Sequence, residues 1–214
     1  MLKNGRIANV PRWGHDGVVV TDLELAKHKA RPEPGVITTP MYPVTIEVAR
    51  KPDIIQIMNL INCENLRSGA VLKVDFMDVR DWVEKKLSLL AKLDDEVIAH
   101  QSASELRQDG WIELRAAVVK REYRDRGIND VLLRLQIEYL LERNPEATLC
   151  ALKNGSSGGV GSLLSAGFRE IPAESAPKEL FEIGGDQRWA IYVLTAEDYM
   201  RKNGLLESVR TVEA

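Results

Sequence analysis

The chain has 214 residues with 29 Lys+Arg against 32 Asp+Glu, so its formal net charge is −3, and 44% of its residues are hydrophobic. This composition excludes disordered and fibrous proteins, and it is less basic than a general nucleic-acid binder, so we expect no nucleic-acid partner. A chain of this length can bury one large core, which makes two domains of full size unexpected.

The cysteines and the apolar segments bear on the compartment. Cys63 and Cys150 are the only cysteines, and both fall within predicted regular structure, which argues against a disulfide scaffold and favours a reducing compartment. Residues 1–14 contain no continuous apolar run, and no later segment approaches the roughly 20 apolar residues that span a bilayer. We therefore expect a cytoplasmic protein with neither a signal peptide nor a membrane partner.

Residues 1–42 differ from the rest of the chain because prolines interrupt them repeatedly. Between the prolines, Val18–Val20 predicts a short strand and Asp22–Lys29 a brief helix. We predict that these residues form an N-terminal extension or arm. Three arrangements stay open: the arm covers part of the core, crosses to a second subunit of a homodimer, or is loosely held.

A regular series of elements begins at Val44. Val44–Val48 alternates as a strand does, and Pro52-Asp53 then opens a helix whose apolar residues mark a buried face. A second helix is predicted over Asp78–Lys86. Turns at Asp94-Asp95 and at 107–110 then separate three predicted antiparallel strands, which are Leu87–Leu93, Glu96–Glu105 and Trp111–Lys120.

The second half of this region alternates helices and strands. A helix is predicted over Ile128–Arg143, where apolar residues recur every three or four positions and Asn144-Pro145 stops the pattern. The remaining predicted elements are a strand at Ala147–Leu152, a helix at Gly158–Ala166, and strands at Phe168–Ile171 and Arg188–Leu194. The glycine-rich run 155–161 lacks the Lys-Ser/Thr ending of a nucleotide-binding loop, so we expect a simple connection there.

The junction between the strand Trp111–Lys120 and the helix at Ile128 carries the clearest chemical signal. Gly127 allows close approach of a ligand to the backbone, and the free amides of a helix N-terminus bind phosphate oxygens well. Four basic residues give the loop a local positive excess: Lys120, Arg121, Arg124 and Arg126. The loop therefore predicts a site for an anionic ligand, and the alternative is a solvated basic loop.

This junction resembles the central motif of the GCN5-related N-acetyltransferase (GNAT) superfamily. In that motif a strand runs into Arg/Gln-x-x-Gly-x-Gly/Ala and a long helix, and here the segment reads Arg124-Asp125-Arg126-Gly127-Ile128-Asn129. The order of predicted elements from Val44 to Leu194 is also similar to that superfamily. The resemblance implies an α/β (α+β) fold with a mixed, mostly antiparallel central sheet flanked by helices, and it divides the chain into residues 1–42, an acyltransferase domain at 43–195, and a C-terminal helix or tail at 196–214.

The resemblance also implies a cofactor, which is acetyl-CoA or another acyl-CoA as co-substrate, with no metal. Its pyrophosphate would lie on the loop amides of Arg124, Asp125, Arg126, Gly127, Ile128 and Asn129, and its pantetheine arm would pair with the backbone of Ala117, Val118 and Val119. Asn154 is a further expected contact to that arm, or else a loop-capping residue. Asn129 departs from the family, which usually places Gly or Ala there, and its side chain either crowds the phosphate or donates to it.

Amide formation from a thioester needs a base for the attacking amine. The resemblance places Glu113 in that role, because several members carry a glutamate at this position of the strand. Strand alternation puts Glu113 on one face with Arg115, so the alternative is a solvated or salt-bridged carboxylate. His100 is either a second candidate base or a structural histidine.

The departing thiolate usually needs a proton donor as well. Many members of the superfamily use a Tyr four residues before a Gly-Phe pair, but that position is Leu163 here. We take Tyr192 as the candidate acid, with Ser162, Ser165 and water as alternatives. Cys150 is expected to be a small buried hydrophobe. His15 and His28 lack partners at metal-ligand spacing, so no metal site is predicted.

These observations predict an acyl-CoA-dependent N-acyltransferase, in the simplest case an N-acetyltransferase. A small-molecule or peptide amine would attack the thioester directly, with no covalent enzyme intermediate. Two alternatives stay open. One is a CoA-binding module without turnover, which the residues at 129 and 163 suggest, and the other is an acyltransferase that takes its acyl group from an acyl carrier protein through the basic loop.

Overall fold

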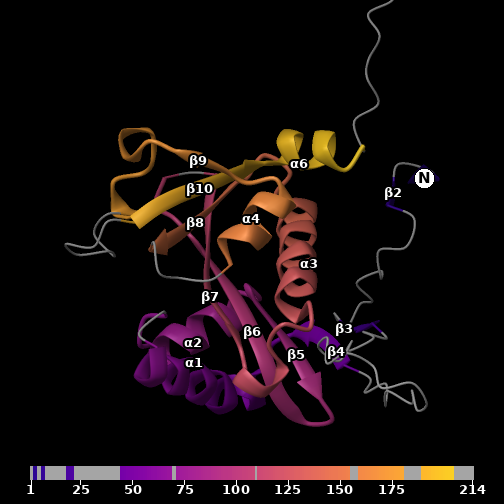
Figure 1. The fold of residues 1–214 in the computed structure, drawn as a ribbon, viewed down its shortest axis with the longest axis vertical. Coiled ribbons are helices and arrows are strands. Elements are labelled where there is room, and N and C mark those ends of the chain that lie inside the picture. Colours follow the sequence, from indigo (N-terminus) through magenta and orange to yellow (C-terminus); the bar gives the residue numbers. More distant parts are fainter. Residues whose placement is uncertain are drawn as a thin grey trace, which may run out of the picture.

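The computed structural model describes residues 2–3, 6–7, 18–21, 44–68, 71–108, 110–154, 159–180 and 189–204. The helix predicted over Asp22–Lys29 lies outside the described residues, as do Asp109 in the predicted turn at 107–110 and residues 155–158 of the glycine-rich run. The described elements from Val44 onward follow the predicted order, and their ends differ from the predicted ones by at most a few residues. Figure 1 shows their arrangement.

An eight-stranded sheet forms the centre of the molecule, with the strand order β3-β4-β5-β6-β7-β8-β10-β9. All neighbouring pairs are antiparallel except β7 and β8, which are parallel. Its strands are β3 (Val18–Thr21), β4 (Val44–Val48), β5 (Ser88–Leu93), β6 (Glu96–Glu105), β7 (Trp111–Val119), β8 (Thr148–Asn154), β9 (Arg169–Ile171) and β10 (Trp189–Thr195). A separate pair is formed by β1 (Leu2–Lys3) and β2 (Arg6–Ile7). Because β3 pairs with β4, part of the predicted extension adds an edge strand to the sheet.

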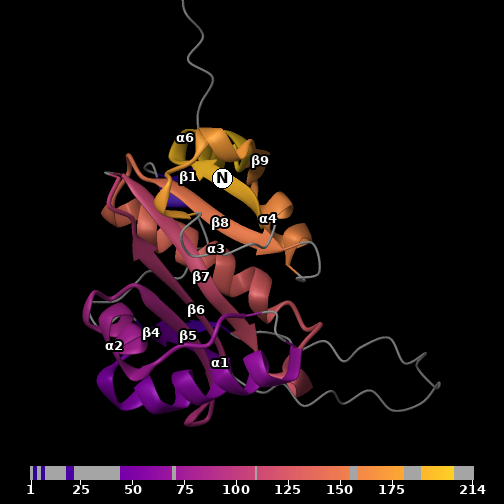
Figure 2. The same cartoon turned by 90° about the vertical axis from the view of Figure 1, so that its left-hand side faces the viewer.

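Helices cover both faces of the sheet (Figures 1 and 2). On one face, α1 (Ile54–Ser68) and α2 (Phe76–Glu84) pack against apolar side chains such as Leu90 and Val118. On the other face, α3 (Ile128–Arg143) and α4 (Val160–Ala166) pack against side chains such as Leu114 and Ala151. The remaining helical segments are η1 (Lys51–Asp53), η2 (Arg121–Tyr123), η3 (Ala173–Ser175) and α6 (Ala196–Lys202).

The two central strands separate partway along their length. Paired positions of β7 and β8 run from Trp111 opposite Thr148 to Leu114 opposite Ala151 and stop there. Both strands continue, β7 to Val119 and β8 to Asn154, and β8 remains paired with β10 on its other side. The diverging ends leave a wedge in the middle of the sheet, where no described strand pairs with the backbone groups of β7 on the β8 side.

A β-bulge in β7 lies at the start of this wedge. The register between β6 and β7 shifts between His100 and Ser102, so that Ala116 and Ala117 together face Gln101. Ala116 has φ 51°, a left-handed conformation that is uncommon for a residue with a Cβ. Bulges bend their strand and increase its twist, so this one turns the end of β7 away from β8.

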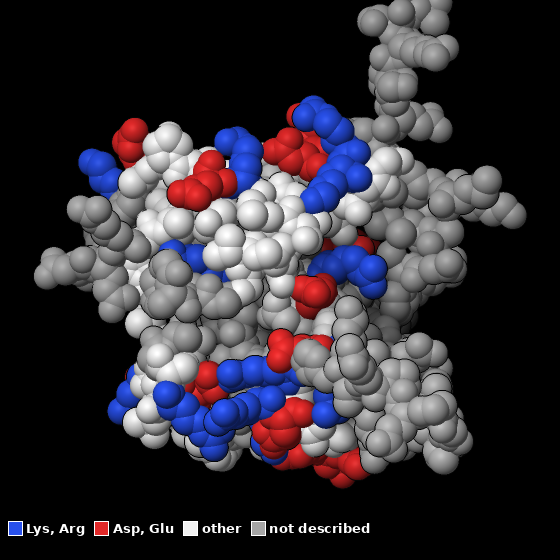
Figure 3. Space-filling model, in the orientation of Figure 1, with Lys and Arg blue, Asp and Glu red and all other residues white. Residues whose placement is uncertain are grey.

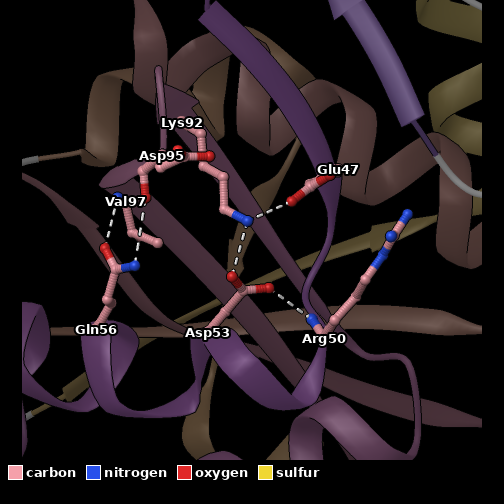
Figure 4. Close-up of polar contacts among 7 residues, drawn as sticks. All are labelled: Glu47, Arg50, Asp53, Gln56, Lys92, Asp95 and Val97. Atoms are coloured by element: carbon pink, nitrogen blue, oxygen red, sulfur yellow. Dashed lines mark hydrogen bonds and ion pairs between the residues drawn. The ribbon is translucent and has the colours of Figure 1, made fainter.

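An ion-pair cluster fixes the start of α1 to the sheet (Figure 4). The Lys92 ammonium on β5 lies 2.6 Å from the Glu47 carboxylate and 2.7 Å from the Asp53 carboxylate. Asp53 is buried and also accepts a hydrogen bond from the Arg50 backbone N–H at 2.8 Å. Burial disfavours the charged ammonium, but the two carboxylates outweigh it and raise the pKa of Lys92. The cluster therefore links β4, β5 and η1, the segment that leads into α1.

We expect Lys92→Met to lower the free energy of unfolding by about 3 kcal/mol, because it leaves the buried Asp53 carboxylate without its cation. Urea denaturation followed by circular dichroism measures the change. Lys85→Met is the matched control, because Lys85 pairs with Asp81 on the exposed surface of α2 and its loss should cost less than about 0.5 kcal/mol. Equal losses in the two variants would contradict the role of the cluster.

Candidate active site

A cleft of about 180 Å³ occupies the wedge between β7 and β8. Its walls come from both strands, from the connection between α1 and α2, and from α3 and α4. The two sides of the cleft belong to opposite faces of the sheet. Glu113, Arg115 and Trp82 lie on the face of α1 and α2, whereas Ala151, Asn129 and Leu163 lie on the face of α3 and α4.

Glu113 is the buried carboxylate of the cleft, with 4% of its surface exposed. It lies in a central strand rather than a solvated one, and its Oε2 has no hydrogen-bond partner among the described residues. The nearest cation is Arg115, whose Nε lies 3.8 Å from that oxygen. Burial raises the pKa of Glu113, Arg115 opposes the rise, and the charge of Glu179 adds to it. Such a carboxylate accepts a proton more readily than a solvated one.

Arg115 is held in place by three neighbours. Its guanidinium stacks over the Trp82 ring at 5.8 Å from the ring centroid, and its Nη1 donates to Ser104 Oγ at 3.2 Å. Together with the ion pair to Glu113, these contacts confirm that the two side chains share one face, as strand alternation predicts. The arrangement keeps a fixed positive charge beside the candidate base.

The N-terminus of α3, which begins after Gly127, contributes Asn129 to the cleft wall. Gly127 has φ 75°, a conformation that favours glycine, and a Cβ built there would meet no described atom within 4 Å. The Val131 N–H donates to the Gly127 carbonyl, so the N–H groups of Ile128, Asn129 and Asp130 precede the first intrahelical bond of α3. Ile128 is buried in the core, and only its backbone can face a ligand. Free amides at a helix N-terminus carry a partial positive charge, which favours an anion at this end of α3.

Asn129 and the end of β7 complete this wall. Asn129 lines the cleft, and its side-chain Nδ2 donates to Ser162 Oγ on α4 at 3.3 Å. The Lys120 N–H donates to the Ile98 carbonyl, so Val119, which is registered with Ala99, is in a non-hydrogen-bonded pair and directs its own backbone groups toward the open side. The Val119 carbonyl is already taken by Arg124 Nε at 3.0 Å, whereas Ala117 lines the cleft.

Neighbouring carboxylates neutralise part of the positive charge of the basic loop in the structure. Lys120 is paired with Glu96 and Glu122, and Arg124 Nη2 lies 2.6 Å from the Glu64 carboxylate on α1. Burial opposes ionisation of Glu64, but this pair outweighs it and lowers the pKa of Glu64. Figure 3 shows the same mixture on one face of the molecule, where basic side chains are interleaved with acidic ones.

Arg126 and Asp125 complete the loop. The Arg126 guanidinium stacks over the Tyr123 ring at 5.5 Å from the ring centroid, and Asp125 has a left-handed backbone with φ 58°. An anion at this loop therefore depends mainly on the amides that follow Gly127, with help from Arg126, rather than on all four basic side chains predicted for it.

His100 supports the bulge beneath the cleft. Its imidazole is fully buried, stacks with Trp82 at 6.0 Å between ring centroids, and contacts Ser88 Oγ at 2.7 Å and the Ala116 carbonyl at 3.1 Å. The carbonyl is only an acceptor, so Nδ1 donates to it and Nε2 accepts from Ser88. Burial lowers the pKa of His100 to about 4, with the bond to Ala116 opposing the change, so the ring is neutral. Both ring nitrogens are engaged, which favours the structural alternative over a second base.

We expect His100 to make folding stability depend on pH. Its pKa of about 4 in the folded protein lies below the ordinary value of about 6.5, so its full contribution exists above pH 6.5 and is lost as the pH falls toward 4. Between pH 6.5 and 5 the loss amounts to about 2 kcal/mol. His100→Gln keeps a donor and an acceptor but cannot titrate, so urea denaturation at both pH values should show this loss in the parent only. The same loss in both proteins would contradict the assignment.

The hydroxyl groups considered as proton donors lie away from this cleft. Tyr192 faces the α3 side, but its hydroxyl donates to the Glu170 carboxylate on β9 at 3.2 Å, and Tyr192 is not among the residues that line the cleft. Ser162 and Ser165 line a separate hollow between α3, α4 and α6. Leu163 does line the cleft, and it presents only an aliphatic chain. The structure therefore does not bring Tyr192 together with Glu113.

The sequence reasoning missed four charged or amide side chains of the cleft, which are Lys73, Asp78, Gln101 and Lys153. Lys153 on β8 lines the cleft next to Gly159, and burial lowers its pKa. Gln101, opposite the bulge, is 2% exposed, and within the described part of the chain its Oε1 has no hydrogen-bond partner. Nothing in the local sequence separates Lys153 from an ordinary surface lysine, because its burial depends on α4 and on the divergence of β7.

Asn154 and Cys150 are the remaining residues considered in the sequence. Asn154 ends β8, but its side chain lies outside what the structure describes. Cys150 is fully buried beside Ile191 and Val193, and burial raises the pKa of its thiol, with the Glu113 and Glu179 charges adding to the rise. Among the described residues, no group of His, Cys, Asp and Glu is arranged to hold a metal ion, and no helix there is long and apolar enough to cross a membrane.

Residues 54–157 match the family model described as the acetyltransferase (GNAT) family. No curated protein matches the sequence closely enough to count as a relative. Solved structures share the fold. An N-acetylglutamate synthase from Neisseria gonorrhoeae, solved with coenzyme A and N-acetyl-glutamate, is 18% identical with a TM-score of 0.60 over 70% of this chain.

Two further structures are similar over a comparable region. A ribosomal-protein-alanine N-acetyltransferase from Brucella melitensis is 21% identical with a TM-score of 0.57 over 70% of this chain. A Salmonella typhimurium protein, solved with its cofactor acetyl-CoA, is 19% identical with a TM-score of 0.57 over 72% of this chain. This chain spans 34% of the synthase and 98% and 94% of the other two proteins. The predicted fold class, a mixed and mostly antiparallel sheet flanked by helices, is confirmed.

Proposed function

Because residues 54–157 of this chain belong to the acetyltransferase (GNAT) family, we propose that the protein transfers an acyl group, in the simplest case acetyl, from coenzyme A to an amine. One observation carries the proposal. The wedge between β7 and β8 holds a cleft that joins the amide-bearing N-terminus of α3 to a buried carboxylate with a raised pKa. A phosphate-bearing thioester and an amine can meet in such a cleft.

The coenzyme would lie along the α3 wall. Its pyrophosphate would accept hydrogen bonds from the loop of Arg124, Asp125 and Arg126 and from the amides that follow Gly127. The pantetheine arm would take the place of the missing strand beside Ala117, Val118 and Val119, where backbone groups of β7 face the open wedge. Asn129 lines this path and Asn154 ends the strand on its far side, so both would contact the arm.

The amine would approach from the face of α1 and α2, where Glu113 lies. Glu113 would remove a proton as the amine nitrogen forms a bond to the thioester carbonyl carbon. The tetrahedral intermediate then loses the coenzyme thiolate as the C–S bond breaks and the carbonyl reforms. No covalent enzyme intermediate is needed, because the cleft holds both reactants at once.

A CoA-binding module without turnover is the second candidate, and a specific observation favours it. No hydroxyl among the described residues of the cleft stands where a tyrosine would serve as acid, because Leu163 occupies that position. An acyl carrier protein as donor has less support, since Lys120 and Arg124, two of the four basic residues of the loop, are already paired with carboxylates.

Incubation of the protein with acetyl-CoA and a panel of amines, followed by free-thiol release, tests the proposal. The panel should include amino acids, polyamines and short peptides with free N-termini. We expect thiol release that depends on both the protein and one class of amine. Tight binding of acetyl-CoA without release for any acceptor would support the binding module instead.

A further inference from the structure

A lysine on the coenzyme side of the cleft has no role in the mechanism above. Lys153 lies on β8 beyond Ala151, the last residue of that strand paired with β7. Alternation along β8 puts its side chain on the Ala151 face, toward α3 and α4. A Cβ at Gly159, which precedes α4, would lie 3.5 Å from Lys153 Nζ, so the ammonium lies beside the start of that helix.

Glu113 and Lys153 approach the wedge from opposite faces of the sheet. Glu113 is registered with Cys150 on β8, whereas Lys153 shares the face of the neighbouring Ala151. The candidate base is therefore on the amine side and the ammonium on the coenzyme side. A reaction that removes a proton from one reactant and delivers one to the other requires this separation.

The environment of Lys153 calls for an anion that the described residues do not supply. Among the described residues, no carboxylate forms an ion pair with Lys153. Its burial disfavours the charged form and lowers its pKa. A partly buried cation without a counter-ion gains most when a negative charge develops beside it.

Lys153 is also the one titratable donor among the described lining residues on this side of the cleft. Its neighbours there are Ala151, Leu163, Leu133 and Asn129, none of which exchanges a proton at neutral pH. Arg115 lies on the amine face, and its guanidinium keeps its proton in proteins. Protonation of the leaving group from this wall therefore falls to Lys153.

We propose that Lys153 donates the proton to the coenzyme sulfur as the thioester breaks, which rests on the acyltransferase function proposed above. The C–S electron pair moves to sulfur, and sulfur takes a proton from Nζ as coenzyme A leaves as the thiol. Lys153 becomes a neutral amine and recovers its proton from water. With the amine proton removed at Glu113, the sum is thioester plus amine to amide plus thiol.

The chemistry of the two groups suits this transfer. A thiol has an ordinary pKa of about 8.5, and an ammonium with a pKa lowered toward that value shares its proton with the departing sulfur more readily than an unperturbed lysine does. A guanidinium at the same place would stabilise the negative charge but would not give up its proton.

Replacing Lys153 by methionine and by arginine separates the two roles. We expect kcat to fall by about 100-fold in Lys153→Met and by a similar factor in Lys153→Arg, with the KM for acetyl-CoA in Lys153→Arg within about twofold of the parent. Restored kcat in Lys153→Arg, with a raised KM in Lys153→Met, would mean that Lys153 only binds the coenzyme, and would overturn the proposal. Lys85→Met on the exposed face of α2 is the control and should behave as the parent does.

The pH dependence of kcat gives a second readout in the unaltered protein. We expect kcat to fall at high pH as Lys153 loses its proton, and this limb to be absent from the Met variant. A high-pH limb that is the same in both proteins would overturn the proposal, and a parent without any high-pH limb would do so even where the variants fail to fold. No thiol release by the parent would instead refute the acyltransferase function, so the two failures are distinguishable.

Discussion

Glu113→Gln should lower kcat by about 100- to 1,000-fold while the Kd for acetyl-CoA stays within about twofold of the parent. Glutamine has the size and the acceptor oxygen of glutamate but cannot take the proton of the amine. Because Glu113 lies on the face of α1 and α2, opposite the proposed coenzyme wall, its charge should matter little to coenzyme binding. Initial rates of thiol release and isothermal titration with acetyl-CoA measure the two quantities.

The same assignment fixes the direction of the pH dependence. Burial raises the pKa of Glu113, so activity should be full above that raised pKa and fall as the pH drops through it. The midpoint of this fall in activity should therefore lie above the ordinary pKa range of a solvated glutamate. The fall should disappear in Glu113→Gln. Glu105→Gln, at the exposed end of β6, is the matched control and should change neither quantity. Equal losses of turnover and coenzyme affinity in Glu113→Gln would exclude Glu113 as the base.

Gly127→Glu should weaken acetyl-CoA binding by about 100-fold, which corresponds to about 3 kcal/mol. The new side chain would extend into open space, since no described atom lies within 4 Å of a Cβ at this position. Its carboxylate would then stand near the amides after Gly127 and repel the pyrophosphate that they are proposed to hold.

A control is needed that separates backbone strain at residue 127 from the effect of the new charge. With φ 75°, any side chain at this position adds strain, whatever its charge. Gly127→Gln carries the same strain and nearly the same shape without the charge, so it should bind acetyl-CoA at least about tenfold more tightly than Gly127→Glu. Thermal denaturation checks that both variants remain folded. Equal affinities in the two variants would show that the pyrophosphate lies elsewhere.

Local patterns in the sequence accounted for most of the fold. The helix at Ile128–Arg143 and the strand at Glu96–Glu105 were predicted with the ends that the structure gives them. Both are bounded by strong local signals, which are Gly127 and Asn144-Pro145 for the helix and the Asp94-Asp95 turn for the strand. Periodicity and turn residues predict the ends of an element correctly where the residues that end it lie next to it in the sequence.

The parts that sequence reasoning missed depend on contacts between distant segments. Ala116 has a left-handed backbone because of the bulge against β6 and the hydrogen bond from His100, and neither is visible in its neighbours along the chain. Arg124 contributes less positive charge than its motif implies, because Glu64 on α1 pairs with it. Such pairings form only when the sheet assembles.

Lys153 illustrates the same limit within the candidate site. Its chemistry follows from burial in a cleft, and that cleft exists because two parallel strands separate after Leu114 and Ala151. The resemblance to a family motif and to its preceding strand located Gly127 and Glu113. The sequence contained no local signal for Lys153, which lies on the face of the sheet opposite Glu113.

A crystal structure of the protein soaked with acetyl-CoA tests the central claim most directly. We expect the pantetheine arm in the wedge between β7 and β8, with its sulfur between Glu113 and Lys153 and its pyrophosphate on the amides after Gly127. An arm bound outside the wedge, or a wedge that stays empty at saturating acetyl-CoA, would contradict the assignment of this cleft as the acyl-transfer site.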